Sequence, residues 1–72
     1  MSKNRERELQ ERVAALETAI EEHEGLLETL GAQINEASGR GDLTAVTEIG
    51  GRYEAARAEV ERLLEEWTEL AG

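Results

Sequence analysis

One histidine lies inside the densest group of acidic residues in this chain of 72 residues. Carboxylates beside an imidazole could bind a divalent cation or exchange protons with a substrate. Both activities need a concave pocket with converging side chains, and zinc would need a second His or a Cys at ligand spacing. We therefore expect no catalytic, cofactor or metal site. We interpret His23 as a structural residue, and Glu21, Glu22, Glu24 and Glu28 as a solvated acidic face.

Two glycine-containing segments carry an arginine that could approach a phosphate group. They are Gly39-Arg40-Gly41 and Gly50-Gly51-Arg52. A phosphate-binding loop also needs a Gly-Lys-Ser/Thr ending and a strand before it, and neither segment has them. The sequence therefore predicts no nucleotide site.

Several basic residues gather near the start of the chain. Such side chains hold phosphate backbones through their charge, so a local basic cluster could contact nucleic acid. However, the chain has 17 acidic and 8 basic residues, and its net charge of −9 opposes strong binding of nucleic acid. The candidate contacts are Lys3, Arg5, Arg7 and Arg12, together with Arg40, whose alternative role is that of a soluble turn residue.

Two apolar stripes at heptad spacing give the clearest structural signal. Residues that repeat every 3.5 positions let one helix pack along another, with knobs in holes. Two such stripes joined by a short turn predict an all-α fold, a two-helix antiparallel coiled-coil hairpin. The stripes contain Leu9, Val13, Leu16, Ile20, His23, Leu27, Leu30, Ile34 and Ala37, and then Val46, Ile49, Tyr53, Ala56, Val60, Leu63, Trp67 and Leu70.

The break between the stripes predicts where the helices end. Gly39 or Gly41 can adopt the left-handed conformation that closes a helix, and Asp42 is a natural N-cap for the next one. The expected ranges are 1–4 for a disordered segment or linker start and 5–72 for the hairpin domain, with helices over about 5–37 and 43–70 and a turn over 38–42.

Antiparallel packing also predicts a register for the two stripes. The chosen register leaves room for the turn, and it places Glu24 near Arg57 and Gly31 near Gly50. The paired positions are Ala37–Val46, Ile34–Ile49, Leu30–Tyr53, Leu27–Ala56, His23–Val60, Ile20–Leu63, Leu16–Trp67 and Val13–Leu70.

Four glycines fall inside the expected helices, at Gly25, Gly31, Gly50 and Gly51. Each costs about 0.5–1 kcal/mol relative to Ala. One interpretation is neutral drift at solvated positions. The alternative is a softer distal third of the hairpin.

Apolar residues beside the stripes predict a way for two hairpins to associate. Leu26 and Leu64 widen the apolar surface, and with Trp67 they could support a homodimer built as a four-helix bundle. No apolar run is long enough to span a bilayer, so no membrane contact is expected.

Four segments of the chain resemble the C-terminal coiled-coil domain of ABC-F ATP-binding proteins of the Uup type. The resemblance covers residues 5–71, and the last segment is its most characteristic part. The segments are Arg5-Glu6-Arg7-Glu8-Leu9, Val13-Ala14-Ala15-Leu16-Glu17-Thr18-Ala19-Ile20-Glu21, Gly41-Asp42, and Leu63-Leu64-Glu65-Glu66-Trp67-Thr68-Glu69-Leu70.

This resemblance implies an accessory arm of a soluble, cytoplasmic protein whose two ATP-binding cassettes lie elsewhere in the parent chain. ATP and Mg would bind the parent, which would be the ATPase, and this fragment would hold no cofactor. The arm would contact DNA, ribosomal RNA or a partner protein. The alternative function is a structural spacer or dimerisation hairpin of another large protein.

Overall fold

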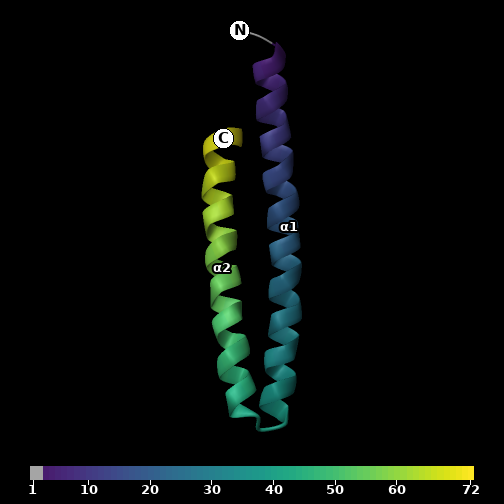
Figure 1. Ribbon diagram of the computed structural model, residues 1–72, viewed down its shortest axis with the longest axis vertical. Helices are drawn as coiled ribbons and strands as arrows, with labels where there is room; N and C mark the ends of the chain where they lie inside the picture. The colour runs from purple at the N-terminus through teal and green to yellow at the C-terminus, as the bar shows by residue number, and fades with distance from the viewer. Residues whose placement is uncertain (1–2) are drawn as a thin grey trace.

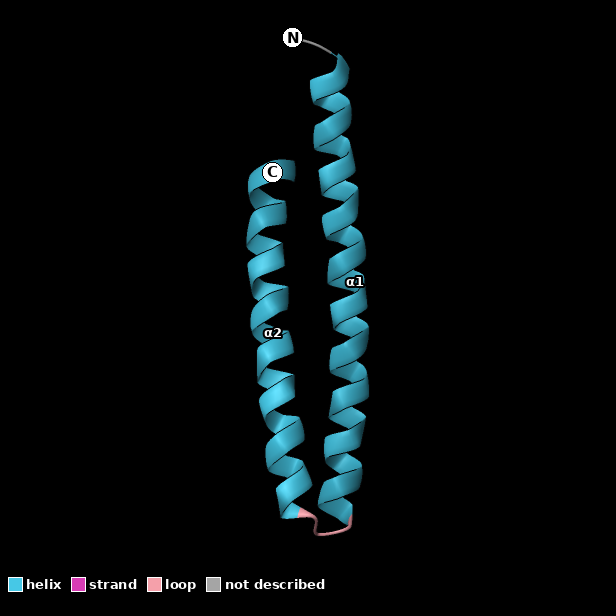
Figure 2. Cartoon of the chain, viewed as in Figure 1, coloured by secondary structure: helices cyan, strands magenta, loops and turns pink. Residues whose placement is uncertain are grey.

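Residues 3–72 are described by the computed structural model, and they form two long helices joined by a tight turn. Helix α1 spans Lys3–Gly39 and helix α2 spans Leu43–Ala71. The two helices run antiparallel and side by side, in a rod that measures 59 × 15 × 14 Å (Figure 1). Residues 3–72 contain only helix and loop (Figure 2). The predicted all-α hairpin is confirmed.

Helix α1 begins earlier and ends later than the sequence predicts. Lys3 and Asn4, expected in a disordered segment or linker, belong to its first turn, while Met1 and Ser2 lie outside the described residues. No Pro or Gly interrupts the sequence before Leu9, so nothing in these residues stops the helix from extending to Lys3. At the other end, α1 continues to Gly39, beyond the predicted end at about residue 37. The reason is that the hydrogen bonds that close the helix come from the N–H groups of Gly41 and Asp42.

The turn closes α1 with a Schellman motif. The N–H of Asp42 donates to the carbonyl of Ala37 at 2.9 Å, and the N–H of Gly41 donates to the carbonyl of Ser38 at 3.0 Å. Gly41 has φ +73°, the left-handed conformation that this motif requires and that glycine adopts without strain. Gly41, and not Gly39, is therefore the residue that ends the helix.

Asp42 starts α2 immediately after the Schellman motif. Its Oδ1 accepts a hydrogen bond from the N–H of Ala45 at 3.1 Å, which satisfies one of the free donors at the helix start. One residue thus takes part in closing α1 through its backbone and opens α2 through its side chain. The loop needs only residues 40–42 as a result.

The core is a single seam made by the two stripes. Every buried residue in 3–72 belongs to a heptad position, and no polar side chain is buried among them. Leu9 also belongs to the first stripe but is 42% exposed, because α2 ends before it can cover that position. The buried residues are Leu16, Leu30, Ala37, Ala56, Val60 and Leu63.

His23 occupies its place in the seam with its imidazole satisfied by the backbone. Nδ1 lies 2.8 Å from the carbonyl oxygen of Ala19, one turn earlier in α1, where the Nδ1–H tautomer donates. This bond lets a half-buried histidine stand at an apolar heptad position.

Contacts between the helices agree with the predicted register. Trp67 bonds to Glu17, next to its assigned partner Leu16, and the ring of Tyr53 lies beside Gly31, next to Leu30. The predicted proximity of Glu24 and Arg57 gives no ion pair between them among residues 3–72. Arg57 pairs instead with Glu54 on its own helix, at 3.5 Å. A partner three residues away is a surface neighbour on the same helix and needs no alignment between helices.

Candidate functional site

Helix α1 extends beyond the end of α2 at the open end of the hairpin (Figure 1). It has 37 residues against 29 in α2, and α2 ends at Ala71, close to the level of Val13 in the register. We call residues 3–11 the overhang. Three of the predicted nucleic-acid contacts lie in this overhang and are exposed: Lys3, Arg5 and Arg7.

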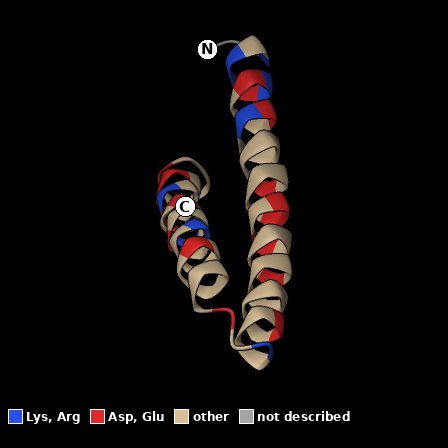
Figure 3. Cartoon of the chain, turned by 60° about the horizontal axis from the view of Figure 1, so that its bottom comes forward, with Lys and Arg blue, Asp and Glu red and all other residues tan. Residues whose placement is uncertain are grey.

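The basic residues near the start of α1 do not share one face. Lys3 and Arg7 are four residues apart and lie on one side of the helix, whereas Arg5 and Arg12 are seven apart and lie on another. Glutamates separate them along the chain, and Figure 3 shows blue and red alternating in the first turns of α1. The overhang is therefore a mixed surface with no net charge, and not a continuous basic patch.

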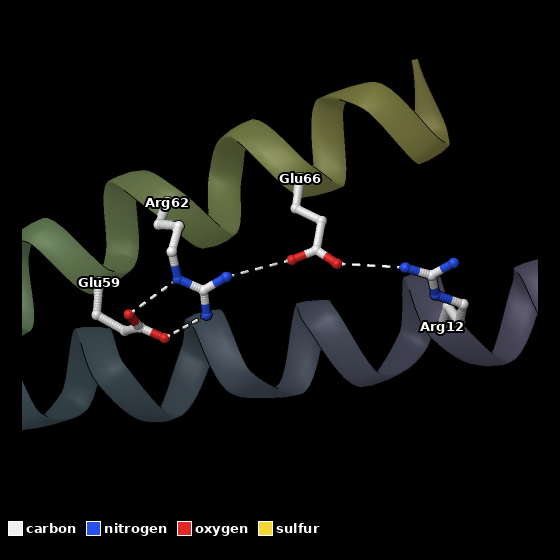
Figure 4. Close-up of polar contacts among 4 residues, drawn as sticks. All are labelled: Arg12, Glu59, Arg62 and Glu66. Carbon is white, nitrogen blue, oxygen red and sulfur yellow. Dashed lines mark hydrogen bonds and ion pairs between the residues drawn. The ribbon is translucent and has the colours of Figure 1, made fainter.

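Arg12 belongs to a chain of ion pairs across the two helices (Figure 4). Its Nη2 lies 3.4 Å from Oε2 of Glu66, and Oε1 of Glu66 lies 3.5 Å from Nη1 of Arg62. Arg62 in turn donates two hydrogen bonds to Glu59, at 3.1 Å from Nε and 2.6 Å from Nη2. A phosphate contact by Arg12 would therefore compete with its exposed ion pair to Glu66, which Glu66 shares with Arg62.

Arg40 lies at the other end of the rod, in the turn. Its guanidinium contacts Oε1 of Glu36 at 3.1 Å and Oδ2 of Asp42 at 3.8 Å. Two carboxylates beside one cation leave the tip with net negative charge. Arg40 and the overhang also lie at opposite ends of the rod, whose whole length is 59 Å. The two predicted groups of basic residues thus cannot act as one phosphate-binding surface.

Glu59, at one end of the ion-pair chain, has a lowered pKa. The hydrogen bond from Arg62 holds the pKa of Glu59 below its ordinary value, with smaller contributions from the charges of Arg62 and His23. The same bond raises the pKa of Arg62. Arg62 is exposed and Glu59 is half-buried at the surface, so the pair fixes side-chain geometry and is screened by solvent.

A pH dependence follows from the lowered pKa of Glu59. A carboxylate whose folded pKa lies below its unfolded value stabilises the fold above the unfolded pKa, and loses that effect as pH falls through the folded pKa. We expect Glu59→Gln to have a lower Tm than wild type at neutral pH, with the difference vanishing in acid. Thermal melts of both proteins from neutral pH to below the ordinary glutamate pKa of about 4.5 measure this difference.

Glu61→Gln is the matched control, since Glu61 is an exposed glutamate on the same helix with no ion pair among residues 3–72. Its Tm difference from wild type should stay small at every pH. A Glu59→Gln difference that is equally large in acid would contradict the expectation.

Trp67 forms a polar contact that sequence reasoning missed. Its indole Nε1 donates to Oε2 of Glu17 at 3.0 Å, from α2 to α1. A signal for this bond was present in the register, since Glu17 follows Leu16, the residue assigned to face Trp67. The half-buried indole is thus bound to its own hairpin through its N–H.

The predicted association residues lie on opposite edges of the seam. Leu26 shares a shallow groove with Ala55 and Glu59, whereas Leu64 lies about 140° around α2 from Glu59. Leu64 borders a separate hollow lined by Glu65, Thr68 and Glu69. Leu26 and Leu64, both predicted to support association of two hairpins, therefore lie on two separate surfaces, and the association itself stays a prediction.

The charged residues of the hairpin do not converge on a metal site. Among residues 3–72, no group of three or more His, Asp or Glu side chains is arranged to hold a metal ion. Neither helix within this range is long and apolar enough to cross a membrane.

Comparison with known proteins gives one match that covers the whole chain. A family model for the ABC transporter C-terminal domain matches residues 1–72. The chain belongs to this family. The match confirms the resemblance expected from the heptads and the Glu-Glu-Trp segment at the level of the ABC transporter C-terminal domain, and it makes the hairpin an accessory part of an ABC protein. Neither a curated protein nor a solved structure matches the chain.

Proposed function

We propose that this ABC transporter C-terminal domain is the accessory coiled-coil arm of an ABC-F ATP-binding protein of the Uup type. ATP and Mg bind elsewhere in the parent chain, which performs the hydrolysis. The hairpin itself carries no catalysis and contacts nucleic acid, DNA or ribosomal RNA, through the overhang of α1. The family match and the uneven distribution of charge along the rod support this proposal.

We place the nucleic-acid contact at the overhang because charge is distributed unevenly along the rod. The overhang, residues 3–11, holds three basic and three acidic side chains and has no net charge. The rest of the chain carries the whole net charge of −9, which becomes −10 over residues 13–72 once Arg12 is left out. A phosphate backbone is repelled along most of the rod, so the approach with the least repulsion is at the overhang.

Lys3, Arg5 and Arg7 are the side chains that we assign to this contact. All three are exposed, and none takes part in the ion pairs found within residues 3–72. Lys3 and Arg7 lie on one side of α1 and Arg5 lies on another. A nucleic-acid strand, or the edge of a groove, that approaches α1 from one side would therefore meet at most two of these cations. Contacts of this kind go to phosphates and carry no base specificity.

Salt dependence tests the contact. Each neutralised phosphate on a duplex contributes about −0.9 to the slope of log K against log salt, so two or three cations predict a slope of about −2 to −3. Fluorescence anisotropy with a short DNA duplex and a ribosomal RNA helix, started at low salt, measures it. We expect weak binding that the combined variant Lys3→Glu, Arg5→Glu and Arg7→Glu abolishes.

Arg40→Glu is the matched control for this experiment, because it makes the same change of charge at the far end of the rod. It should leave the affinity within about twofold of wild type. An Arg40→Glu loss as large as that of the combined variant would contradict the assignment to the overhang. Absence of binding at low salt would reject nucleic-acid contact altogether.

A second candidate function is a structural spacer that contacts a partner protein. The continuous seam and the charge of −10 over residues 13–72 favour it, since a stiff acidic rod repels nucleic acid and holds its ends apart. This candidate predicts no salt-dependent binding of DNA or RNA. The anisotropy experiment therefore separates the two functions.

A further inference from the structure

One exposed leucine differs in its surroundings from the other large apolar residues on the surface. Leu9, Leu26, Leu43 and Leu64 are each more than 40% exposed. Leu26 lies in a groove that residues of both helices line, whereas the hollow beside Leu64 is lined by α2 alone. A groove formed by two helices can receive a side chain from a third.

The groove has a small apolar floor. Ala55 and Ala56 line it from α2, and Leu26 and Leu30 line it from α1 beside His23. Ala56 and Leu30 are buried, while Leu26 is 44% exposed, so the leucine forms a raised wall next to an alanine floor. We call this surface the Leu26 groove. Its shape is that of a hole with an adjacent knob, the two parts that helix packing combines.

Two opposite charges flank the Leu26 groove. Arg52 and Glu59 line it on either side of Ala55 and Ala56 along α2. None of the ion pairs in residues 3–72 includes Arg52. Glu59 already accepts two hydrogen bonds from Arg62 of its own helix, so at an interface it would be shared between two arginines. A twofold axis through the centre of the groove would exchange its two ends. Arg52 of one copy would then meet Glu59 of the other, and this contact would occur twice.

The opposite edge of the seam does not offer this complementarity. Glu24 and Glu28 line it beside Tyr53, and Glu17 lies on it at Trp67. Arg57 also lies on this edge, seven residues before Leu64, but it pairs with Glu54 on its own helix. Two copies that met there would bring several glutamates together, which destabilises an interface. The charges thus select the Leu26 edge over the Leu64 edge for contact between identical chains.

We propose that a second copy of this chain docks on the Leu26 groove, so that two hairpins form an antiparallel four-helix bundle with twofold symmetry. Leu26 of each copy packs over Ala55 of the other, and Arg52 pairs with Glu59 across the interface. The two helices lie side by side over the 29 residues of α2, about 44 Å, and the rod is 15 Å wide. A face of about 650 Å² results, of the same order as the roughly 800 Å² per partner that specific interfaces bury. The proposal is independent of the nucleic-acid contact, which uses the overhang.

Sedimentation equilibrium over a wide range of concentration tests the dimer. The wild-type chain of 8.0 kDa should approach twice that mass as concentration rises. Leu26→Glu should weaken the dimer about tenfold or more, because it places a charge at the centre of the apolar contact. Leu64→Glu is the matched control, with the same change on the opposite edge, and should keep the wild-type dissociation constant within about twofold.

A charge exchange tests the symmetry directly. Arg52→Glu alone and Glu59→Arg alone each create two repulsive contacts, so each variant should be monomeric where the wild type is dimeric. An equimolar mixture of the two variants restores both attractive pairs and should form a heterodimer. Circular dichroism of each variant establishes that it is helical before the masses are compared.

Three results would overturn the proposal. They are a wild-type mass that stays at one chain at every concentration, a loss of dimer with Leu64→Glu equal to that with Leu26→Glu, and a mixture of the charge variants that remains monomeric. The last result is informative even if a single variant is less stable, since both partners are first shown to be folded.

Discussion

Leu63→Ala is expected to remove most of the helical structure of the hairpin near physiological temperature. Leu63 is 5% exposed and lies in the middle of the seam. Truncation of a buried leucine to alanine costs about 2–5 kcal/mol, through lost burial and the cavity that remains. A chain of this size with one narrow core rarely has more than about 3–5 kcal/mol of stability. The change is therefore comparable to the whole free energy of unfolding.

Leu64→Ala provides the comparison for that result, one residue away in the same helix. It makes the same chemical change at a side chain that is 41% exposed, so helix propensity is matched and burial differs. Thermal melts followed by far-UV circular dichroism should show a drop in Tm of at least about 10 °C for Leu63→Ala and only a few degrees for Leu64→Ala. Equal effects of the two substitutions would mean that the seam is not the core.

Replacement of three helical glycines by alanine is expected to stabilise the hairpin by about 2–3 kcal/mol in total. Gly25, Gly50 and Gly51 lie inside α1 and α2, and a Cβ built on each meets no atom within 4 Å. Alanine fits these sites without strain and is favoured over glycine by about 0.8–1 kcal/mol per helical position. The melting temperature of the triple variant should rise by about 10 °C or more.

Gly41→Ala is the opposing control for the glycine variant. Gly41 also has open space around a built Cβ, but its φ of +73° is costly for any residue with a side chain. We expect it to destabilise the hairpin by about 1 kcal/mol. Amide exchange adds a second readout: if Gly50 and Gly51 soften the distal third, exchange there should slow in the triple variant more than near Ile20. Stabilisation without this slowing would favour neutral drift as the origin of the glycines.

The fold could be predicted from the sequence because one physical signal governs it. Apolar residues with a period of 3.5 can be buried together only along one side of a helix, and two such helices cover each other. The break at residues 38–42 fixes the antiparallel order. The chemistry of Asp42 predicts the cap, but two glycines were candidates for the end of α1. Only the formed hydrogen bonds from Gly41 and Asp42 decide between them.

The polar surface was much harder to predict. Arg12 and Arg57 have long side chains with several glutamates in reach, and exposed ion pairs differ by only tenths of a kcal/mol. Sequence spacing therefore did not predict that Arg57 pairs with Glu54 or that Arg12 pairs with Glu66. The separation of Leu26 from Leu64, in contrast, could have been deduced. Each residue lies at a definite angle from its own stripe, and antiparallel packing places those two angles on opposite edges.

The tight turn at residues 40–42 has a consequence for how such arms change in evolution. Because the loop has no slack, neither helix can slide along the other, and a single inserted residue would rotate all following apolar positions by about 100°. Only additions of whole heptads to both helices preserve the seam. Each such addition lengthens the rod by about 10 Å. The length of the hairpin can therefore change only in steps of one heptad, or two helical turns, in each helix.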